Sequence, residues 1–304
     1  MALPSSGPLS LSQIQTEFGG TNPISLSEYY GAASGIPASG TISINNFYGA
    51  SAGPAQSGLQ NYFDMSVSAA NGGSTVTSSS ISDLSGNSSN ATRGSITTYQ
   101  NSTLPFYVST KNIGGYIDFN IGNLTNNNGV CTVELWARIT EDDNTVWHGF
   151  NQYDIYHRGS STSPQEFGFN LWNNDIWGPS TSTSQALNWP DAWKHWVFIY
   201  NSSTSTTQSV LTATRQSNLL YVNAVSQTLA QDGSPSSANN SRCKFNNNGQ
   251  TLGDYRLGDE LQRSSGTVYS TDMDVAIVRT YNRALTASEI SNHFNLEKAR
   301  FGIS

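Results

Sequence analysis

The feature that most restricts the fold is a period-two alternation of apolar and polar residues, which recurs in short stretches from residue 57 onward. It is clearest in "CTVELWARI" and also occurs in "GGYIDFNI", "HWVFIYNS" and "MDVAIVRTY". Successive side chains of a β-strand point to opposite faces of its sheet, so this pattern predicts strands. In the first stretch, one face receives Val133, Leu135 and Ala137, and the other receives Glu134, Trp136 and Arg138.

Clusters of Gly, Asn and Ser, such as "GNLTNNNG" and "NNNGQTLG", separate these stretches and favour turns. After residue 57 helix signals are almost absent until "LTASEISNHFNLEKARF". There Thr286 and Glu289 have the spacing of a capping box, and Ile290, Phe294 and Leu296 form an apolar stripe. The sequence therefore predicts a mostly β protein, a sandwich or jelly roll, with a helix near 287–298.

The composition of the 304 residues excludes several classes of partner. Only 12% of the residues are charged and the net charge is −7, so no basic stripe is available to neutralise the phosphates of a nucleic acid. No apolar run approaches the roughly 18 residues of a membrane-spanning helix, so we expect no membrane insertion. Cys131 and Cys243 are either buried free thiols or a disulfide, and without a His cluster beside them they form no zinc site.

The first 56 residues have a different texture, in which a short motif recurs. "ISLSEYYG" is followed by "ISINNFYG", and "LSLSQIQTEFGG" upstream is a longer version of the same theme. Each copy contains a Ser that can cap a helical turn and a Gly that can end it. We expect a capping box of Ser12 with Gln15 in the longer copy. The shorter copies would be capped by Ser25 or Ser27 and by Ser43, so three short helical turns are predicted.

A segment of this size is expected to form no core of its own, so its apolar side chains need another surface. That surface is either the chain's own large domain or another protein. The duplicated motif favours the second, in a symmetric or repeating assembly. We therefore predict a docking segment over 1–56 and a homo-oligomer, with a trimer favoured. The residues expected to dock are Leu11, Ile14, Phe18, Tyr29, Tyr30, Phe47 and Tyr48.

The run "GPLSLSQIQTEFGG", followed by "ISLSEYYG" and "SGTISINNFYG", resembles a short N-terminal module of virion proteins of tailed bacteriophages. It looks most like those of marine and cyanobacterial phages, labelled tail fibre or structural protein. The resemblance covers residues 1–50 and rests on three Ser-apolar-Gly units in the same order. It implies attachment to other virion proteins and a place on the surface of the particle.

The remainder of the chain, 57–300, resembles the laminin-G-like, concanavalin A-like jelly roll. "NYFDMSVS" with the turn from Asp83 to Gly94 is similar to its opening strand, and "WKHWVFIY" to a strand that carries Trp193 and His195. "LLYVNAV" is similar to a motif in which Gly is usual where Ala224 stands, and "DMDVAIVRTYNRALTASEI" to the closing strand and last helix. The resemblance implies one jelly-roll domain over 57–304, with a structural role for Trp193.

Hydrolysis of a glycan in this kind of fold needs two carboxylates a few ångströms apart on one strand face. No E-x-D-x-E pattern occurs, and Glu134 lies alone in its strand. Asp272 and Asp274 alternate correctly but fall at the entrance of the closing strand. No G-x-S-x-G, P-loop or H-E-x-x-H pattern occurs either, so we expect no enzymatic activity.

Several members of the jelly-roll family bind Ca²⁺ through Asp, Asn and backbone oxygens, and Asp118, Asp272 and Asp274 are the nearest candidates here. The closing strand reads "MDVA" and lacks the acidic doublet that would strengthen such a site. These carboxylates are either calcium ligands or hydrogen-bonded turn residues. The second alternative is favoured, so no cofactor is predicted.

Aromatic and amide side chains cluster between residues 144 and 193. Aromatic rings stack on the C–H faces of sugars and amides bond sugar hydroxyls, so the mixture suits a glycan site. Large aromatic residues also fill cores, and that alternative stays open. The candidate glycan contacts are Trp147, Tyr153, Tyr156, Trp172, Asn173 and Trp177.

These observations favour a non-enzymatic virion protein, a tail or neck fibre that displays a lectin-like jelly roll toward glycans of the host surface. One alternative is a head-decoration or collar protein with a purely structural role. Another is a polysaccharide depolymerase.

Overall fold

The computed structural model describes a large part of the chain in two compact units. One unit is Met1–Gly58 together with Thr286–Ser304, and the other is Leu59–Leu285. The predicted division into 1–56 and 57–304 stays a prediction. The described residues are 3–20, 22–30, 32–33, 36–37, 39–50, 55, 57–66, 80–94, 98–100, 107–110, 115–122, 124, 129–139, 145–150, 153–158, 166–170, 176–178, 192–205, 207–231, 245, 253–258 and 272–304.

The helical elements of the first unit are short. They are α1 (Leu11–Phe18), η1 (Leu26–Tyr29), η2 (Ile44–Phe47), α3 (Ala287–Glu297) and η6 (Lys298–Phe301). The predicted C-terminal helix is confirmed, with Thr286 as its N-cap and Glu289 closing a capping box. No helix among the described residues is both long and apolar enough to span a membrane.

The three predicted turns near the N-terminus form, and each begins with a capping box. Ser25 pairs with Glu28 before η1, and Ser43 pairs with Asn46 before η2. In α1 the cap is Ser10 with Gln13, so the expected cap at Ser12 was wrong by two residues. Ser10 and Ser12 are each followed three residues later by a glutamine, so either could form a capping box. The helix begins after Ser10, and in this helix Ile14 is buried.

The expectation that this segment has no core of its own was also wrong. The fourth residue after each cap is buried in a shared apolar cluster, and these residues are Ile14, Tyr29 and Phe47. Phe18 packs against the same cluster. Its ring and the rings of Tyr29 and Phe47 form a triangle with centroids 5.8–5.9 Å apart. Four of the seven residues expected to dock therefore serve this core.

Hydrogen bonds close this small core at its ends and loops. The backbone N–H of Leu3 donates to the carbonyl of Ala50, at 2.8 Å, and so joins the two ends of the segment. The hydroxyl of Tyr48 donates to the carbonyl of Gly7, at 2.7 Å, and that of Tyr30 donates to the carbonyl of Gly40. We call residues 3–50 the N-terminal module. Leu11 and Tyr30 remain exposed on it, each at 37%.

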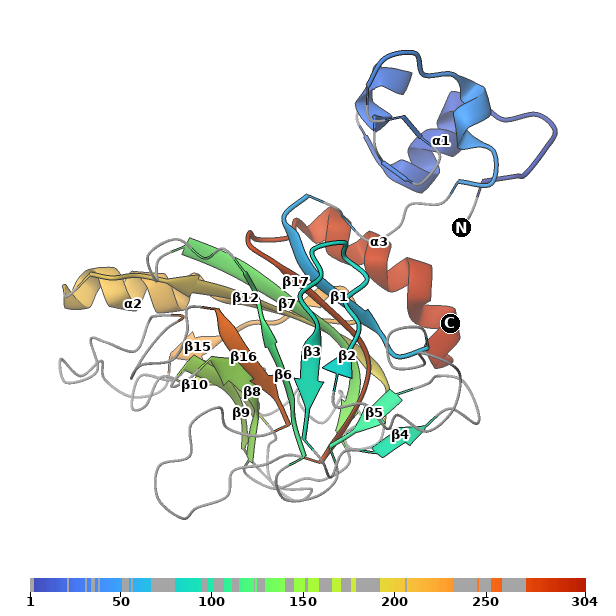
Figure 1. The fold of residues 1–304 in the computed structure, drawn as a ribbon. Helices are drawn as coiled ribbons and strands as arrows, with labels where there is room; N and C mark the ends of the chain where they lie inside the picture. The colour runs from blue at the N-terminus through green and yellow to red at the C-terminus, as the bar shows by residue number, and fades with distance from the viewer. Residues whose placement is uncertain are drawn as a thin grey trace. The chain divides into compact units, whose positions relative to one another are not determined.

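The second unit consists of two antiparallel sheets, so the predicted mostly β sandwich is confirmed (Figure 1). Among the described residues, one sheet has the order β14 (Val225–Ser226), β13 (Leu219–Val222), β12 (Lys194–Ser202), β7 (Gly129–Ile139), β17 (Met273–Tyr281), β5 (Tyr107–Ser109), β4 (Thr98–Gln100), with β1 (Leu59–Asp64) also paired to β17. The other has the order β15 (Ala230–Gln231), β11 (Ile176–Gly178), β10 (Glu166–Asn170), β9 (Tyr153–Arg158), β8 (Thr145–Phe150), β16 (Asp254–Leu257), β6 (Ile117–Asn120), β3 (Ala91–Arg93), β2 (Ser80–Ile81). A helix, α2 (Gln208–Gln216), connects β12 to β13.

The main core contains residues from both sheets, as a sandwich requires. Phe169 on β10 meets Phe198 on β12 edge to face, with ring centroids 6.3 Å apart. The hydroxyls of Tyr200 on β12 and Tyr255 on β16 bond one another at 2.7 Å, so two buried polar groups satisfy each other across the core. Cys131 on β7 is a buried free thiol, and burial raises its pKa well above the usual range. Cys243 lies outside the described residues.

The alternation in β7 is as predicted, but both of its faces are buried. Val133, Leu135 and Ala137 belong to the main core, whereas Glu134 and Trp136 are fully buried on the opposite face. There Nε2 of His195 lies 2.7 Å from Oε1 of Glu134, and Nη1 of Arg279 donates to the same oxygen at 3.2 Å. We call Glu134, His195 and Arg279 the buried triad.

The hairpin between β13 and β14 turns through Asn223 and Ala224, both with positive φ, at 50° and 63°. Two such residues form the tight turn that prefers Asn-Gly, because Gly has no Cβ to clash in this region. We expect Ala224→Gly to raise the free energy of unfolding by about 1 kcal/mol. Urea denaturation measures it. Asn223→Gly is the control and should gain less, since Asn tolerates this conformation. An equal or larger gain from the control would contradict the assignment.

Candidate functional site: a polar groove on the nine-stranded sheet

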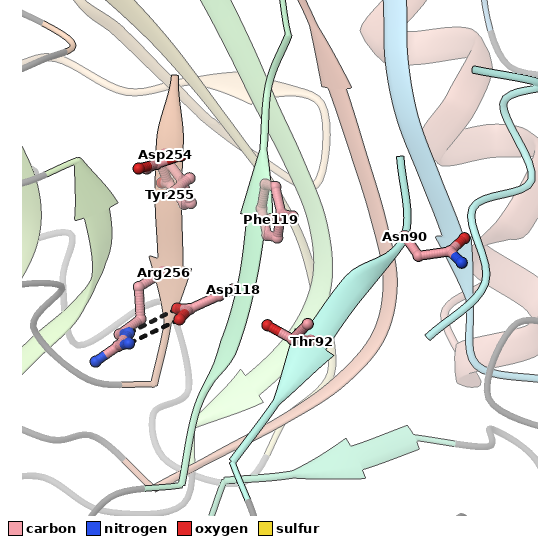
Figure 2. Close-up of a pocket in the computed structure, with 7 residues that line it drawn as sticks. All are labelled: Asn90, Thr92, Asp118, Phe119, Asp254, Tyr255 and Arg256. Carbon is pink, nitrogen blue, oxygen red and sulfur yellow. Dashed lines mark hydrogen bonds and ion pairs between the residues drawn. The ribbon is translucent and has the colours of Figure 1, made fainter. Parts of the chain in front are cut away.

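An open groove of about 380 Å³ lies on the nine-stranded sheet (Figure 2). It is lined by Asn90, Thr92, Asp118, Phe119, Asp254, Tyr255 and Arg256. These residues come from β3, β6 and β16 and from the segment before β3. We call this site the β6–β16 groove.

The strands present charged residues to the groove because their polar and apolar positions alternate. On β6 and β16, Phe119 and Tyr255 point inward, and their rings stack in the main core 5.3 Å apart. The residues on either side of Phe119 along β6 and of Tyr255 along β16 therefore face outward. The antiparallel register sets Arg256 opposite Asp118, and Asp118 opposite Thr92 on β3.

Arg256 and Asp118 form a bidentate ion pair between strands β16 and β6 (Figure 2). Nε of Arg256 donates to Oδ1 of Asp118 at 2.6 Å, and Nη2 donates to Oδ2 at 2.7 Å. The ring of Tyr116 lies beneath the guanidinium, with its centroid 4.0 Å from Cζ. On the far side of Arg256 the paired residue of β8 is Gly149, which has no side chain. The guanidinium is therefore fixed in orientation and paired before any ligand arrives.

A second fixed carboxylate lies two residues along the same pair of strands. Nδ2 of Asn120 donates to Oδ1 of Asp254 at 2.9 Å, and the backbone N–H of Gly122 donates to Oδ1 of Asn120 at 2.7 Å. The bond from Gly122 orients the amide of Asn120, and this amide in turn orients the carboxylate of Asp254. The groove thus offers prearranged carboxylates, a guanidinium, an amide and a hydroxyl, a mixture suited to a ligand rich in hydroxyl groups.

The three calcium candidates are not brought together. Asp118 is committed to Arg256 in the nine-stranded sheet, whereas Asp274 is buried on β17 in the other sheet. Asp274 accepts a hydrogen bond of 2.7 Å from Nε of Arg138. Burial acts to lower the pKa of Arg138, but this bond and the attraction of Asp274 raise it overall. The described part of the chain holds no group of three or more His, Cys, Asp or Glu side chains that could bind a metal.

Carboxylates that a hydrolase could use are also engaged elsewhere. Glu134, the lone carboxylate of its strand, belongs to the buried triad and has no exposed surface. In the groove, both oxygens of Asp118 accept hydrogen bonds from Arg256, and Asp254 is held by Asn120. These arrangements suit binding better than proton transfer to a leaving group.

The predicted glycan contacts have different outcomes. The prediction that Tyr153 contacts a glycan was wrong. Tyr153 is buried in the main core, and its hydroxyl donates to Oδ1 of Asn218 at 2.9 Å. Trp147, Tyr156 and Trp177 lie on strands β8, β9 and β11 of the nine-stranded sheet, and the register sets the last two opposite Gly168. Trp172 and Asn173 lie outside the described residues. Apart from Tyr153, these contacts stay predictions.

No family model matches the sequence, and no curated protein is similar to it. Solved structures with a similar arrangement include the receptor binding domain of botulinum neurotoxin C/D mosaic serotype, at 11% identity and a TM-score of 0.49, over 80% of this chain and 52% of that one. Another is a mutant of Trypanosoma rangeli sialidase displaying trans-sialidase activity, at 15% identity and a TM-score of 0.47, over 84% of this chain and 35% of that one.

A third is the binding domain of botulinum neurotoxin DC in complex with rat synaptotagmin II, at 11% identity and a TM-score of 0.47. It is covered over 51% of its length, so the chain spans about half of these toxin chains. Similarity at this level carries no functional information.

Sequence patterns alone do not reveal most of the groove. They indicate Asp118 only as a candidate calcium ligand and do not assign Arg256 and Asp254 to a site. A signal was present, because "IDFN" and "DYRL" both alternate apolar and polar residues, with a charge on the polar face. It could not be used without the register, which alone shows that Arg256 lies opposite Asp118.

Proposed function

We propose that this protein is a non-enzymatic virion protein that binds glycans of the host surface through the β6–β16 groove. The observation that carries the binding role is the fixed polar lining: Arg256 is held between Asp118 and Tyr116, and Asp254 is oriented by Asn120. Donors and acceptors that are already held in place lose little side-chain conformational entropy when they bind hydroxyl groups. Attachment to the virion is supported by the sequence resemblance of residues 1–50, and the place as a tail or neck fibre is part of the proposal.

A glycan array followed by titration calorimetry tests the binding role. One such site should bind a single sugar unit with a dissociation constant near the millimolar range, so adhesion relies on many copies per particle. Asp254→Ala should weaken binding at least about tenfold, because a charge-assisted hydrogen bond is lost. Gln216→Ala, an exposed polar change on α2, is the control. Loss of binding in both variants, or in neither, would refute the hypothesis that glycans bind in the groove. The release of reducing ends from the same glycans would favour the depolymerase.

The docking role of the N-terminal module is a separate part of the proposal. Since Ile14, Tyr29 and Phe47 serve the module's core, docking is left to exposed side chains such as Leu11 and Tyr30. Leu11→Asp places a charge on that surface at the first residue of α1, where a negative charge favours the helix. We expect this variant to stay folded and to be lost from assembled particles. Co-sedimentation with particles measures the loss.

Ser12→Asp is the matched control, since it adds the same charge in the same helical turn at a position that is already polar and exposed. It should be incorporated normally. If Leu11→Asp and Tyr30→Ala are both incorporated like the control, these two side chains do not dock, and other virion proteins must hold the chain elsewhere.

A further inference from the structure

The charges of the β6–β16 groove restrict the ligand beyond the proposed function, on which this inference rests. The described residues that line it include two carboxylates, of Asp118 and Asp254, and one guanidinium, of Arg256, so its formal charge is −1. The whole chain carries −7. An anionic sugar would therefore approach a surface of its own sign.

The pairing of Arg256 matters more than the net charge. A carboxylate or sulfate is recognised best by two parallel N–H bonds from one edge of a guanidinium. The edge that carries Nε and Nη2 is already occupied, because both groups donate to Asp118. An acidic sugar that used this edge would have to displace Asp118 and leave that carboxylate without its partner.

A neutral sugar needs no such displacement. An ionised carboxylate has about four lone-pair sites, and the ion pair uses one on each oxygen of Asp118. Sugar hydroxyls can donate to the carboxylates and accept from the hydroxyl of Thr92 while the ion pair stays intact. We propose that the groove selects neutral glycans and that Asp118 is the residue that excludes acidic ones.

The test uses the full chain on an array of paired glycans. Neutral oligomers of glucose, galactose, mannose and N-acetylglucosamine are printed beside sulfated or carboxylated forms of the same backbones. The wild-type protein should bind a neutral member at least about tenfold more tightly than its acidic counterpart. Asp118→Asn should then raise affinity for the acidic forms at least about tenfold, because Arg256 is released.

Asp254→Asn is the matched control: it removes one negative charge from the same groove but leaves the ion pair in place. It should not gain affinity for the acidic forms, because it also removes a carboxylate that accepts hydrogen bonds from sugar hydroxyls. The double variant D118N/R256Q should not show the increased affinity for acidic glycans. Because it contains no unpaired Arg256, it also keeps the test decisive if that unpaired cation weakens the fold of D118N. Melting temperatures of all variants verify folding.

The outcomes separate this inference from the proposed function. Tighter binding of acidic than of neutral forms by the wild-type protein would overturn the selection of neutral glycans, while glycan binding itself would stand. Equal gains in D118N and D254N would overturn the role of Asp118. Binding of no glycan at millimolar concentration would overturn the proposed function and this inference together.

Discussion

Replacing Glu134 by Gln is expected to lower the free energy of unfolding of the β unit by about 3–5 kcal/mol. The carboxylate is fully buried, and both His195 and Arg279 contact its Oε1. Arg279 is fully buried too, and its guanidinium lies over the ring of Tyr62, with Cζ 4.8 Å from the ring centroid. The variant keeps the shape of the side chain but removes the charge that compensates this cation. Urea denaturation followed by tryptophan fluorescence measures the loss.

Asp118→Asn is the control for this prediction, because it removes the charge from an ion pair that solvent reaches. The side chains of Arg256 and Asp118 are 17% and 27% exposed, so this change should cost about 1 kcal/mol or less. Similar losses of unfolding free energy in the two variants would show that burial does not determine how much the triad stabilises the fold. A nearly unchanged Glu134→Gln would show that Arg279 is compensated by another group.

Phe47→Ala is expected to unfold the N-terminal module while the β-sandwich keeps its melting temperature. Phe47 is fully buried and lies within 5.9 Å of two other rings, those of Phe18 and Tyr29. Truncation of such a ring costs about 3–5 kcal/mol. A folded unit of this length has a total stability of roughly 3–7 kcal/mol, so little or nothing would remain. Hydrogen exchange should show protected amides in residues 3–50 of the wild type and exposed ones in the variant.

Tyr48→Phe is the matched control, since it removes only the hydroxyl that donates to the carbonyl of Gly7. That change should cost about 1 kcal/mol and leave the amides protected. If the wild-type module is unprotected in the isolated protein, it has no stable core by itself. The original expectation of a segment that folds only against a partner would then be restored.

Local patterns in the sequence predicted many of the individual elements, although α2 was not among them. The alternation in "CTVELWARI" predicted which residues of β7 face the core, because the two faces of a strand follow directly from its geometry. The spacing of Thr286 from Glu289 predicted the cap of α3, because a capping box uses only side chains three residues apart. These features depend on neighbours along the chain.

Features that depend on residues far apart in the chain were decided only by the tertiary structure. The module's core brings together Ile14, Tyr29 and Phe47, and three short turns give no sign of how they pack on one another. The groove depends on the register that sets Arg256 opposite Asp118, 138 residues away. The burial of Glu134 depends on His195 and Arg279, from two other strands. A pattern with period two assigns a side chain to a face, but only strand pairing decides which charges meet there.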